Sequence, residues 1–151
     1  MTPLADLARV LTADGEAVVI GSFGTWLTVP QVLDHAPHDL DLFLPDDMDV
    51  IRQKIMLLEA QGSTVYSWQD RVSADVSPAL LQGRYYLRGI RDGLIVDMTY
   101  EIAGTTFESL RPHIVLIDGI RTYDVPAQIR LLAVSDRPDH RARLERMRQL
   151  L

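Results

Sequence analysis

Two apolar stretches of the chain are interrupted by aspartate, and this pattern limits the folds that the chain can adopt. DLDLFL covers residues 39–44 and LIVDMT covers residues 94–99. Alternation of apolar and polar residues predicts strands with one face in the core. In the first strand the leucines face the core, so Asp39 and Asp41 share the opposite face with Cα atoms roughly 6.5 Å apart. Carboxylates are rarely buried without a partner, so either this face is open to solvent or a cation belongs there.

The remaining segments show the patterns of helices and hairpins. Helical spacing of apolar residues predicts helices around residues 4–11 and over 45–62, 126–136 and 137–151. Short strands are predicted within 16–22 and 63–68, with a short helix and a loop after the first. Asp92-Gly93 and Asp118-Gly119 each separate two β-rich runs, which is typical of tight hairpins. This order predicts an α+β (or α/β) fold, a mixed β-sheet with helices packed on it and a C-terminal helical segment.

Composition restricts the class of protein. The chain has 151 residues, 47% of them hydrophobic, and a net charge of −6, which describes a folded domain and argues against general nucleic-acid binding. It has no cysteine, which excludes disulfides, thiolate nucleophiles and cysteine-ligated zinc. No stretch resembles a membrane span or a secretory signal. We therefore expect a cytoplasmic protein with one domain over 1–151, its core over about 1–125 and helices over about 126–151.

Asp97 supplies a third carboxylate within a strand. Val96 and Met98 point to the opposite face, so Asp97 interrupts an apolar strand as the first pair does. Carboxylates in such an arrangement can converge on one hard divalent cation or bridge two about 3.5–4 Å apart. Upstream, VVIGS ends a strand at Gly21-Ser22, where glycine permits close approach of a ligand and the following helix start offers N–H groups to a phosphate. Together these features predict a site for a nucleoside triphosphate.

The order of the motifs IGS, HDLDLFL and LIVDMTYE resembles the DNA polymerase beta-like nucleotidyltransferase superfamily over about residues 16–101. Small members of that superfamily include antibiotic adenylyltransferases and nucleotidyltransferase components of toxin–antitoxin systems. The resemblance implies the nucleotidyltransferase fold and transfer of NMP from an NTP to a hydroxyl acceptor by a two-metal mechanism. The segment DRPDHRARLERM is similar to an Arg-Pro-x-Asp helix of some small members, with His140 where an aspartate is usual.

The same resemblance implies roles for individual residues. Gly21 and Ser22 would contact the triphosphate. Asp39 and Asp41 would bind two Mg²⁺ ions, for which Mn²⁺ can substitute, and Asp97 would help bind the second ion and activate the acceptor hydroxyl. The implied partners are a nucleoside triphosphate and a hydroxyl acceptor of unknown identity.

Arginines form a further candidate binding feature. Arg84, Arg88 and Arg91 are predicted to alternate along one strand face, where they either clamp a triphosphate or acidic acceptor or form a solvated outer face. Of the three, Arg88 is assigned to the nucleotide site.

The last helix also carries arginines. They are expected on its polar face, exposed to solvent or to RNA or a protein partner, while Leu144, Met147 and Leu151 pack inward. These arginines are Arg137, Arg141, Arg143, Arg146 and Arg148.

His35 and His38 precede the first carboxylate pair. With the nearby aspartates they have the residue types of a zinc or manganese site, but an exposed loop pair beside an acidic cleft is the favoured interpretation.

Two classes of function follow. One is an active Mg²⁺-dependent nucleotidyltransferase, favoured by the complete set of three aspartates. The other is a catalytically weak or inactive regulatory or binding protein with the same fold, such as a toxin–antitoxin component. The small size of the chain and the long segment FGTWLTVPQVLDHAPH between Ser22 and Asp39 favour the second. An active enzyme is expected to need a homodimer or a protein partner to complete its acceptor pocket.

Overall fold

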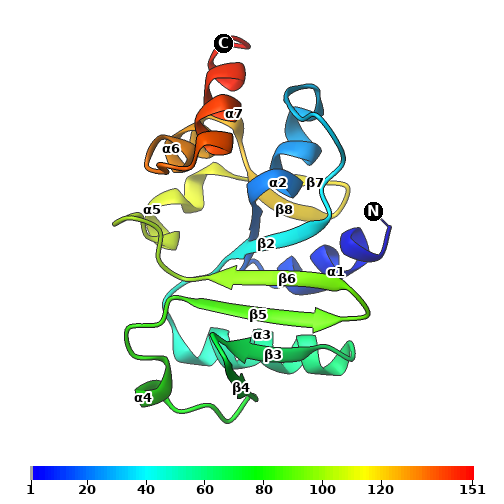
Figure 1. The fold of residues 1–151 in the computed structure, drawn as a ribbon, viewed down its shortest axis with the longest axis vertical. Coiled ribbons are helices and arrows are strands. Elements are labelled where there is room, and N and C mark those ends of the chain that lie inside the picture. Colours follow the sequence, from blue (N-terminus) through cyan, green and yellow to red (C-terminus); the bar gives the residue numbers. More distant parts are fainter. Residues whose placement is uncertain (1) are drawn as a thin grey trace.

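The computed structural model describes residues 2–151, which form a mixed sheet of eight strands with helices packed on it (Figure 1). The order across the sheet is β4-β3-β5-β6-β2-β1-β8-β7. The strands are β1 (Val18–Ile20), β2 (Asp39–Phe43), β3 (Thr64–Ser67), β4 (Asp70–Val72), β5 (Tyr86–Arg91), β6 (Leu94–Thr99), β7 (Ile114–Ile117) and β8 (Ile120–Tyr123). β2 pairs with β6 and β1 with β8 in parallel, and the other neighbours are antiparallel. The predicted α+β class and mixed sheet are therefore confirmed.

Helices connect the strands and close the chain. They are α1 (Thr2–Thr12), α2 (Gly21–Thr28), α3 (Met48–Ala60), α4 (Pro78–Leu81), α5 (Phe107–Leu110), α6 (Val125–Ala133) and α7 (Pro138–Arg148), with 3₁₀ turns η1 (Pro30–Val32) and η2 (Arg111–His113). Asp47 caps α3 by accepting hydrogen bonds from two backbone N–H groups of its first turn, as its residue type predicts. No helix within residues 2–151 combines the length and apolar character needed to traverse a bilayer.

Two layers of apolar side chains cover the two faces of the sheet. The larger core joins α1 and α3 to one face and includes Leu40, Leu42, Val96 and Met98; Figure 1 shows these two helices behind the sheet. A smaller core on the other face joins β1, β2 and β8 to α5 and α6. Phe43 belongs to this second core and is fully buried. The predicted division of β2 into two faces is therefore confirmed, and the aspartate face is itself covered at the Phe43 end.

Both predicted hairpins form around their Asp-Gly turns. Asp92 and Gly93 have φ angles of 48° and 79°, and Asp118 and Gly119 have 52° and 76°. Two successive positive φ angles match the right-handed twist of the flanking strands. The three-residue strand β4 and the short helices α4 and α5 were not predicted, because segments of three or four residues are too short to show a periodic pattern.

The C-terminal helices pack on each other and on η1. Val32, Leu132, Leu144 and Met147 form a separate buried cluster there. Leu151 was predicted to pack inward, and this was wrong: it lies beyond the end of α7 and is 81% exposed. The cluster holds α7 against α6 and η1, on the same side of the molecule as α2 (Figure 1).

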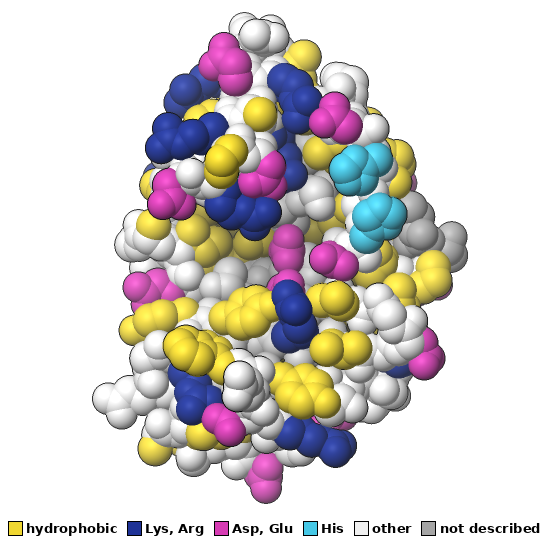
Figure 2. Space-filling view, viewed as in Figure 1, with side chains coloured by type: hydrophobic (Ala, Val, Ile, Leu, Met, Phe, Trp, Pro, Cys, Tyr) yellow, Lys and Arg dark blue, Asp and Glu magenta, His cyan; other side chains and the backbone are white. Residues whose placement is uncertain are grey.

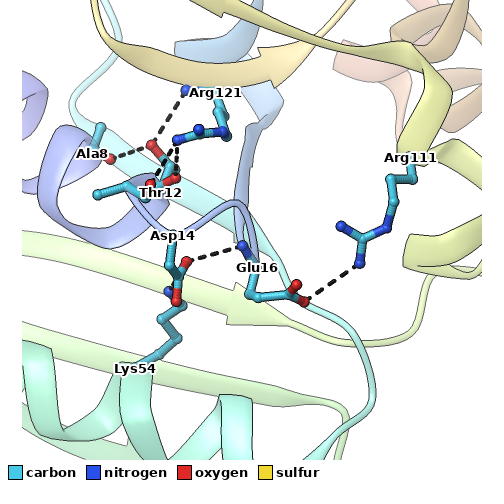
Figure 3. Close-up of polar contacts among 8 residues, drawn as sticks. Ala8, Thr12, Asp14, Glu16, Lys54, Arg111 and Arg121 are labelled. Atoms are coloured by element: carbon cyan, nitrogen blue, oxygen red, sulfur yellow. Dashed lines mark hydrogen bonds and ion pairs between the residues drawn. The ribbon is translucent and has the colours of Figure 1, made fainter.

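A polar network on the α1 side of the molecule joins segments that are distant in sequence (Figure 3). Lys54, the only lysine of the chain, is fully buried on α3, and its Nζ lies 2.8 Å from Asp14 Oδ1. Arg121 on β8 donates to the carbonyl oxygens of Thr12 and Ala13 at 2.8 and 2.9 Å. These carbonyls lie at and just after the end of α1, where intrahelical hydrogen bonds run out, and that of Thr12 also accepts from the N–H of Gly15 at 3.1 Å. The network therefore anchors the end of α1 to both α3 and β8.

Candidate functional site

The site residues predicted from the sequence line one cleft of about 550 Å³. They are Gly21, Ser22, Asp39, Asp41, Arg88 and Asp97. The loop over residues 33–38 and helix α7 complete its walls. Figure 2 shows acidic side chains in the hollow at the centre of this face, with basic side chains on two sides of it. The fold therefore brings together residues that are up to 76 positions apart, from Gly21 to Asp97.

The register of the sheet aligns the charged side chains in one row. Asp41 on β2 is the direct partner of Asp97 on β6, and Asp97 is the direct partner of Arg88 on β5. Asp39 lies two residues before Asp41 on the same face of β2. The cleft floor thus carries three carboxylates and, at one end of the row, a guanidinium group.

Gly21 begins α2 directly against the first carboxylate pair. Its φ of +66° is a left-handed conformation that glycine adopts without strain. A methyl group placed on its Cα would overlap Oδ2 of Asp41. Ile20, the N-cap residue, has no side chain that can cap the helix, so the N–H groups of the first turn remain available to an anion.

Asp41 is the most strongly perturbed of the three carboxyls. Its pKa is raised from 3.8 to about 6, first by burial and then by the neighbouring charges of Asp97 and Asp39. Arg137 and Arg143 oppose this increase. Asp41 is thus the carboxyl that is both buried and flanked by the other two, Asp39 on its own strand and Asp97 on the neighbouring one.

Asp97 has hydrogen-bond donors on both of its oxygens. Arg88 donates from Nε to Oδ1 at 2.8 Å and from Nη2 to Oδ2 at 3.1 Å. The hydroxyl of Tyr86 donates to Oδ1 at 2.7 Å. The pKa of Tyr86 is raised by burial and by this contact. No hydrogen-bonded or ionic partner of this kind is found for Asp39 or Asp41 among the residues that the structure describes.

Helix α7 forms a guanidinium wall opposite the carboxylates. Arg137, Arg143 and Arg146 line the cleft together with His140. The Nε atoms of Arg143 and Arg146 are buried and have no hydrogen-bond partner among the described residues, and burial lowers the pKa of Arg143. Sequence reasoning favoured a solvated polar face for these arginines. The three-residue spacing of Arg143 and Arg146, which puts both on one helix face, is the signal that would have singled them out.

The other candidates divide between the cleft and the surface. The imidazole rings of His35 and His38 stack with centroids 5.7 Å apart and line the cleft beside Asp39. Arg84 instead pairs with Asp70 at 2.6 Å, and Arg91 donates to the carbonyl of a residue at the end of α3. The predicted alignment of three arginines is therefore wrong, because Arg91 lies an odd number of residues from Arg88 and points to the opposite face.

Comparison with solved structures shows what fold this is. The Megavirus polyadenylate synthase matches 98% of the chain with a TM-score of 0.59 and 12% identity. A provisionally assigned nucleotidyltransferase from H. pylori matches 87% of the chain with a TM-score of 0.50 and 16% identity. The chain has the nucleotidyltransferase fold. At these identities the likeness extends to the fold alone, and the chain spans only 31% and 55% of the two proteins. No protein-family model and no curated protein sequence matches it.

Within this nucleotidyltransferase fold, the side chains at the cleft floor are mainly carboxylates. Carboxylate oxygens are the protein ligands that hard divalent cations prefer, and Asp39 and Asp41 present theirs on one strand face. In residues 2–151 no group of three or more His, Cys, Asp or Glu side chains is gathered closely enough to hold a metal ion as it stands. Asp97 is bound to Arg88, whereas the hydrogen bonds and ion pairs of the described residues include none to the side chains of Asp39 and Asp41.

A smaller and more apolar pocket of about 310 Å³ adjoins the cleft. Both hollows are lined by Gly21, Asp41, Arg137, His140 and Arg143. The side chains specific to the smaller pocket come mainly from α6 and from residues 102–103. The two adjoining hollows thus form a charged compartment and a more apolar one, with Asp41 among the residues that border both.

Proposed function

We propose that this protein binds a metal–nucleoside triphosphate complex in the carboxylate cleft and transfers the NMP group to a hydroxyl acceptor. The observation that carries the proposal is the opposition of two charged walls. The sheet contributes Asp39 and Asp41, and α7 contributes Arg143 and Arg146 across the same cleft, with Nη1 of Arg146 also 3.2 Å from Asp34 Oδ1. A ligand that is cationic on one side and anionic on the other satisfies both walls, and a metal-bound triphosphate has this charge distribution.

The groups of the chain have distinct tasks in this reaction. Asp39 and Asp41 would hold divalent cations, Mg²⁺ or Mn²⁺, and Asp97 would contribute to the second of two ions. When bound, these ions neutralise charge that develops on the phosphates. The N–H groups at Gly21 and Ser22 would donate to the terminal phosphates.

Arg143 would add a charge-assisted contact to the same phosphates, since its guanidinium borders the cleft and its Nε has no partner in the described chain. Such hydrogen bonds are stronger than neutral ones. In the transfer step the acceptor oxygen bonds to the α-phosphorus as the bond to the bridging oxygen of the β-phosphate breaks. Pyrophosphate leaves, and the hydroxyl proton passes to Asp97, which faces the cleft.

Calorimetric titration tests the binding step. ATP, GTP and CTP, each with Mg²⁺, are titrated into wild type and into an Asp39→Asn/Asp41→Asn variant. We expect binding to wild type and loss of at least tenfold in affinity in the variant. An Asp49→Asn/Asp75→Asn variant is the matched control, because it removes the same charge from exposed positions outside the cleft. Absence of nucleotide binding to folded wild type would contradict the proposal and direct the search to protein partners.

A further inference from the structure

Arg88 occupies the carboxylate that the second metal ion would need. Its guanidinium contacts both oxygens of Asp97, and the two residues are direct partners across β5 and β6. The pair is bidentate, the strongest arrangement available to an arginine and a carboxylate. A metal ion cannot take either oxygen of Asp97 in this geometry without competing with a donor that is already in place.

The two side chains differ in their freedom to move. The side chain of Arg88 is 42% exposed, whereas that of Asp97 is 17% exposed and is also held by the hydroxyl of Tyr86. Arg88 has four rotatable side-chain bonds and a guanidinium that lines the cleft. Release of the pair is therefore a movement of Arg88 toward the cleft, with Asp97 staying on the strand.

A phosphate group is the ligand that can draw Arg88 away. It offers the planar guanidinium the same two-oxygen contact as the carboxylate does. We propose that Arg88 is a latch that excludes divalent cations from Asp97 until a triphosphate in the cleft takes over its guanidinium. The exclusion half of this proposal, that Arg88 keeps cations from Asp97, follows from the observed contacts alone. The release half, that a triphosphate draws Arg88 away, rests on the proposed nucleotide site. Metal and nucleotide binding are then coupled, so that the second metal ion enters only with its substrate.

The exclusion half is tested with Mn²⁺ alone, by electron paramagnetic resonance of the free ion during titration into the full chain. Arg88→Ala is expected to bind Mn²⁺ at least about tenfold more tightly than wild type, because a charge-assisted contact no longer competes. Removing a positive charge also raises cation affinity in general. The Arg88→Ala/Asp97→Asn variant separates the two effects, since the gain relative to Asp97→Asn should disappear there.

Two further variants make this test specific. Arg84→Ala removes an arginine that pairs with Asp70 outside the cleft and should bind Mn²⁺ as wild type does. Tyr86→Phe removes one donor to Asp97 without changing charge and should have a smaller effect than Arg88→Ala. Equal Mn²⁺ affinity of wild type and folded Arg88→Ala, or a gain that persists in the Asp97→Asn background, would overturn the exclusion half.

Nuclear magnetic resonance of the ¹⁵Nε–¹H group of Arg88 tests release. Mg²⁺ alone should leave this signal in place, and Mg²⁺ with a non-hydrolysable ATP analogue should shift it. The backbone amides of Gly21 and Ser22 report nucleotide binding independently. Shifts at these amides with an unchanged Arg88 signal would overturn the latch while supporting the nucleotide site. No shift at any of the three would overturn the nucleotide site and the release half together.

Discussion

The backbone of Gly21 packs so closely against the carboxylate of Asp41 that no side chain would fit between them, so the turn that starts α2 and Asp41 form one structural unit. A Cβ atom at Gly21 would overlap Asp41 Oδ2. The backbone N–H groups at the start of α2 therefore lie next to the carboxylate that is predicted to hold a metal ion. This contact explains why glycine is required at this position, beyond its left-handed φ of +66°.

The first prediction concerns that contact. Gly21→Ala should destabilise the protein by roughly 1–2 kcal/mol from the left-handed backbone and by about 1 kcal/mol or more from the overlap with Asp41. Gly93→Ala is the matched control, because Gly93 also has a positive φ, of +79°, but a Cβ there would meet nothing within 4 Å. Urea denaturation measures both. Equal losses of stability in the two variants would show that the side chain of Asp41 can move away from the added methyl group without a loss of stability.

The second prediction concerns pH. The pKa of Asp41 is about 6 in the folded protein against an ordinary 3.8, so between these values the native state binds more protons than the unfolded state. Stability from this group is therefore fully present below about pH 4 and is lost as pH rises through about 6. In metal-free buffer, Asp41→Asn should be more stable than wild type at pH 7.5 by on the order of 3 kcal/mol.

At pH 3.5 wild type and Asp41→Asn should differ little in stability, because Asp41 of the folded wild type is protonated and uncharged there. Denaturation midpoints at the two pH values give the comparison. If Asp41→Asn is more stable than wild type by the same amount at both pH values, the charge of Asp41 is not the cause of the difference.

The third prediction separates stability from binding at Arg143. Because its buried Nε has no partner among the described residues and burial lowers its pKa, Arg143→Met should leave the protein as stable as wild type or stabilise it by about 1 kcal/mol. Nucleotide affinity should fall at least about tenfold, the loss of one charge-assisted contact. Arg148→Met, at the exposed end of α7, should change neither quantity in thermal melts and calorimetry.

The fourth prediction concerns the buried ion pair on the far side of the molecule. Lys54 is fully buried, whereas the side chain of Asp14 is 34% exposed. Asp14→Ala leaves an uncompensated buried ammonium group and should cost about 3–5 kcal/mol. Lys54→Met leaves Asp14 partly hydrated and should cost less. The pKa of Asp14 is lowered although burial raises it, because the contacts with Lys54 and the N–H of Glu16 outweigh burial.

Denaturation of both single variants and the double variant measures this asymmetry. Nucleotide binding should be unchanged in Lys54→Met, because neither residue of the pair lines the cleft. If the two single substitutions destabilise the protein equally, the buried ammonium group of Lys54 does not need its partner more than the partly hydrated carboxylate of Asp14 does.

Short-range chemistry in the sequence determined much of the fold and predicted which acidic residues lie together in the cleft. The alternation in DLDLFL assigned Leu40 and Asp41 to opposite faces, and the structure places them so. Asp-Gly turns and the Asp47 cap act within a few residues, so their outcome follows from local backbone and side-chain preferences. Spacing and residue type also predicted that Gly21 and the three aspartates share one site, and the structure places them along one cleft.

Only the tertiary structure decided which charges face one another. The pairing of Arg88 with Asp97 depends on the β5–β6 register, and the arginines of α7 reach the cleft because Leu144 and Met147 dock on α6 and η1. Arg143 lines the same cleft as Asp41, which lies more than a hundred residues earlier in the chain. The residues next to Arg143 in the sequence do not distinguish it from an arginine on a solvated helix face. Charge partners of this kind are set by long-range packing, which sequence periodicity does not encode.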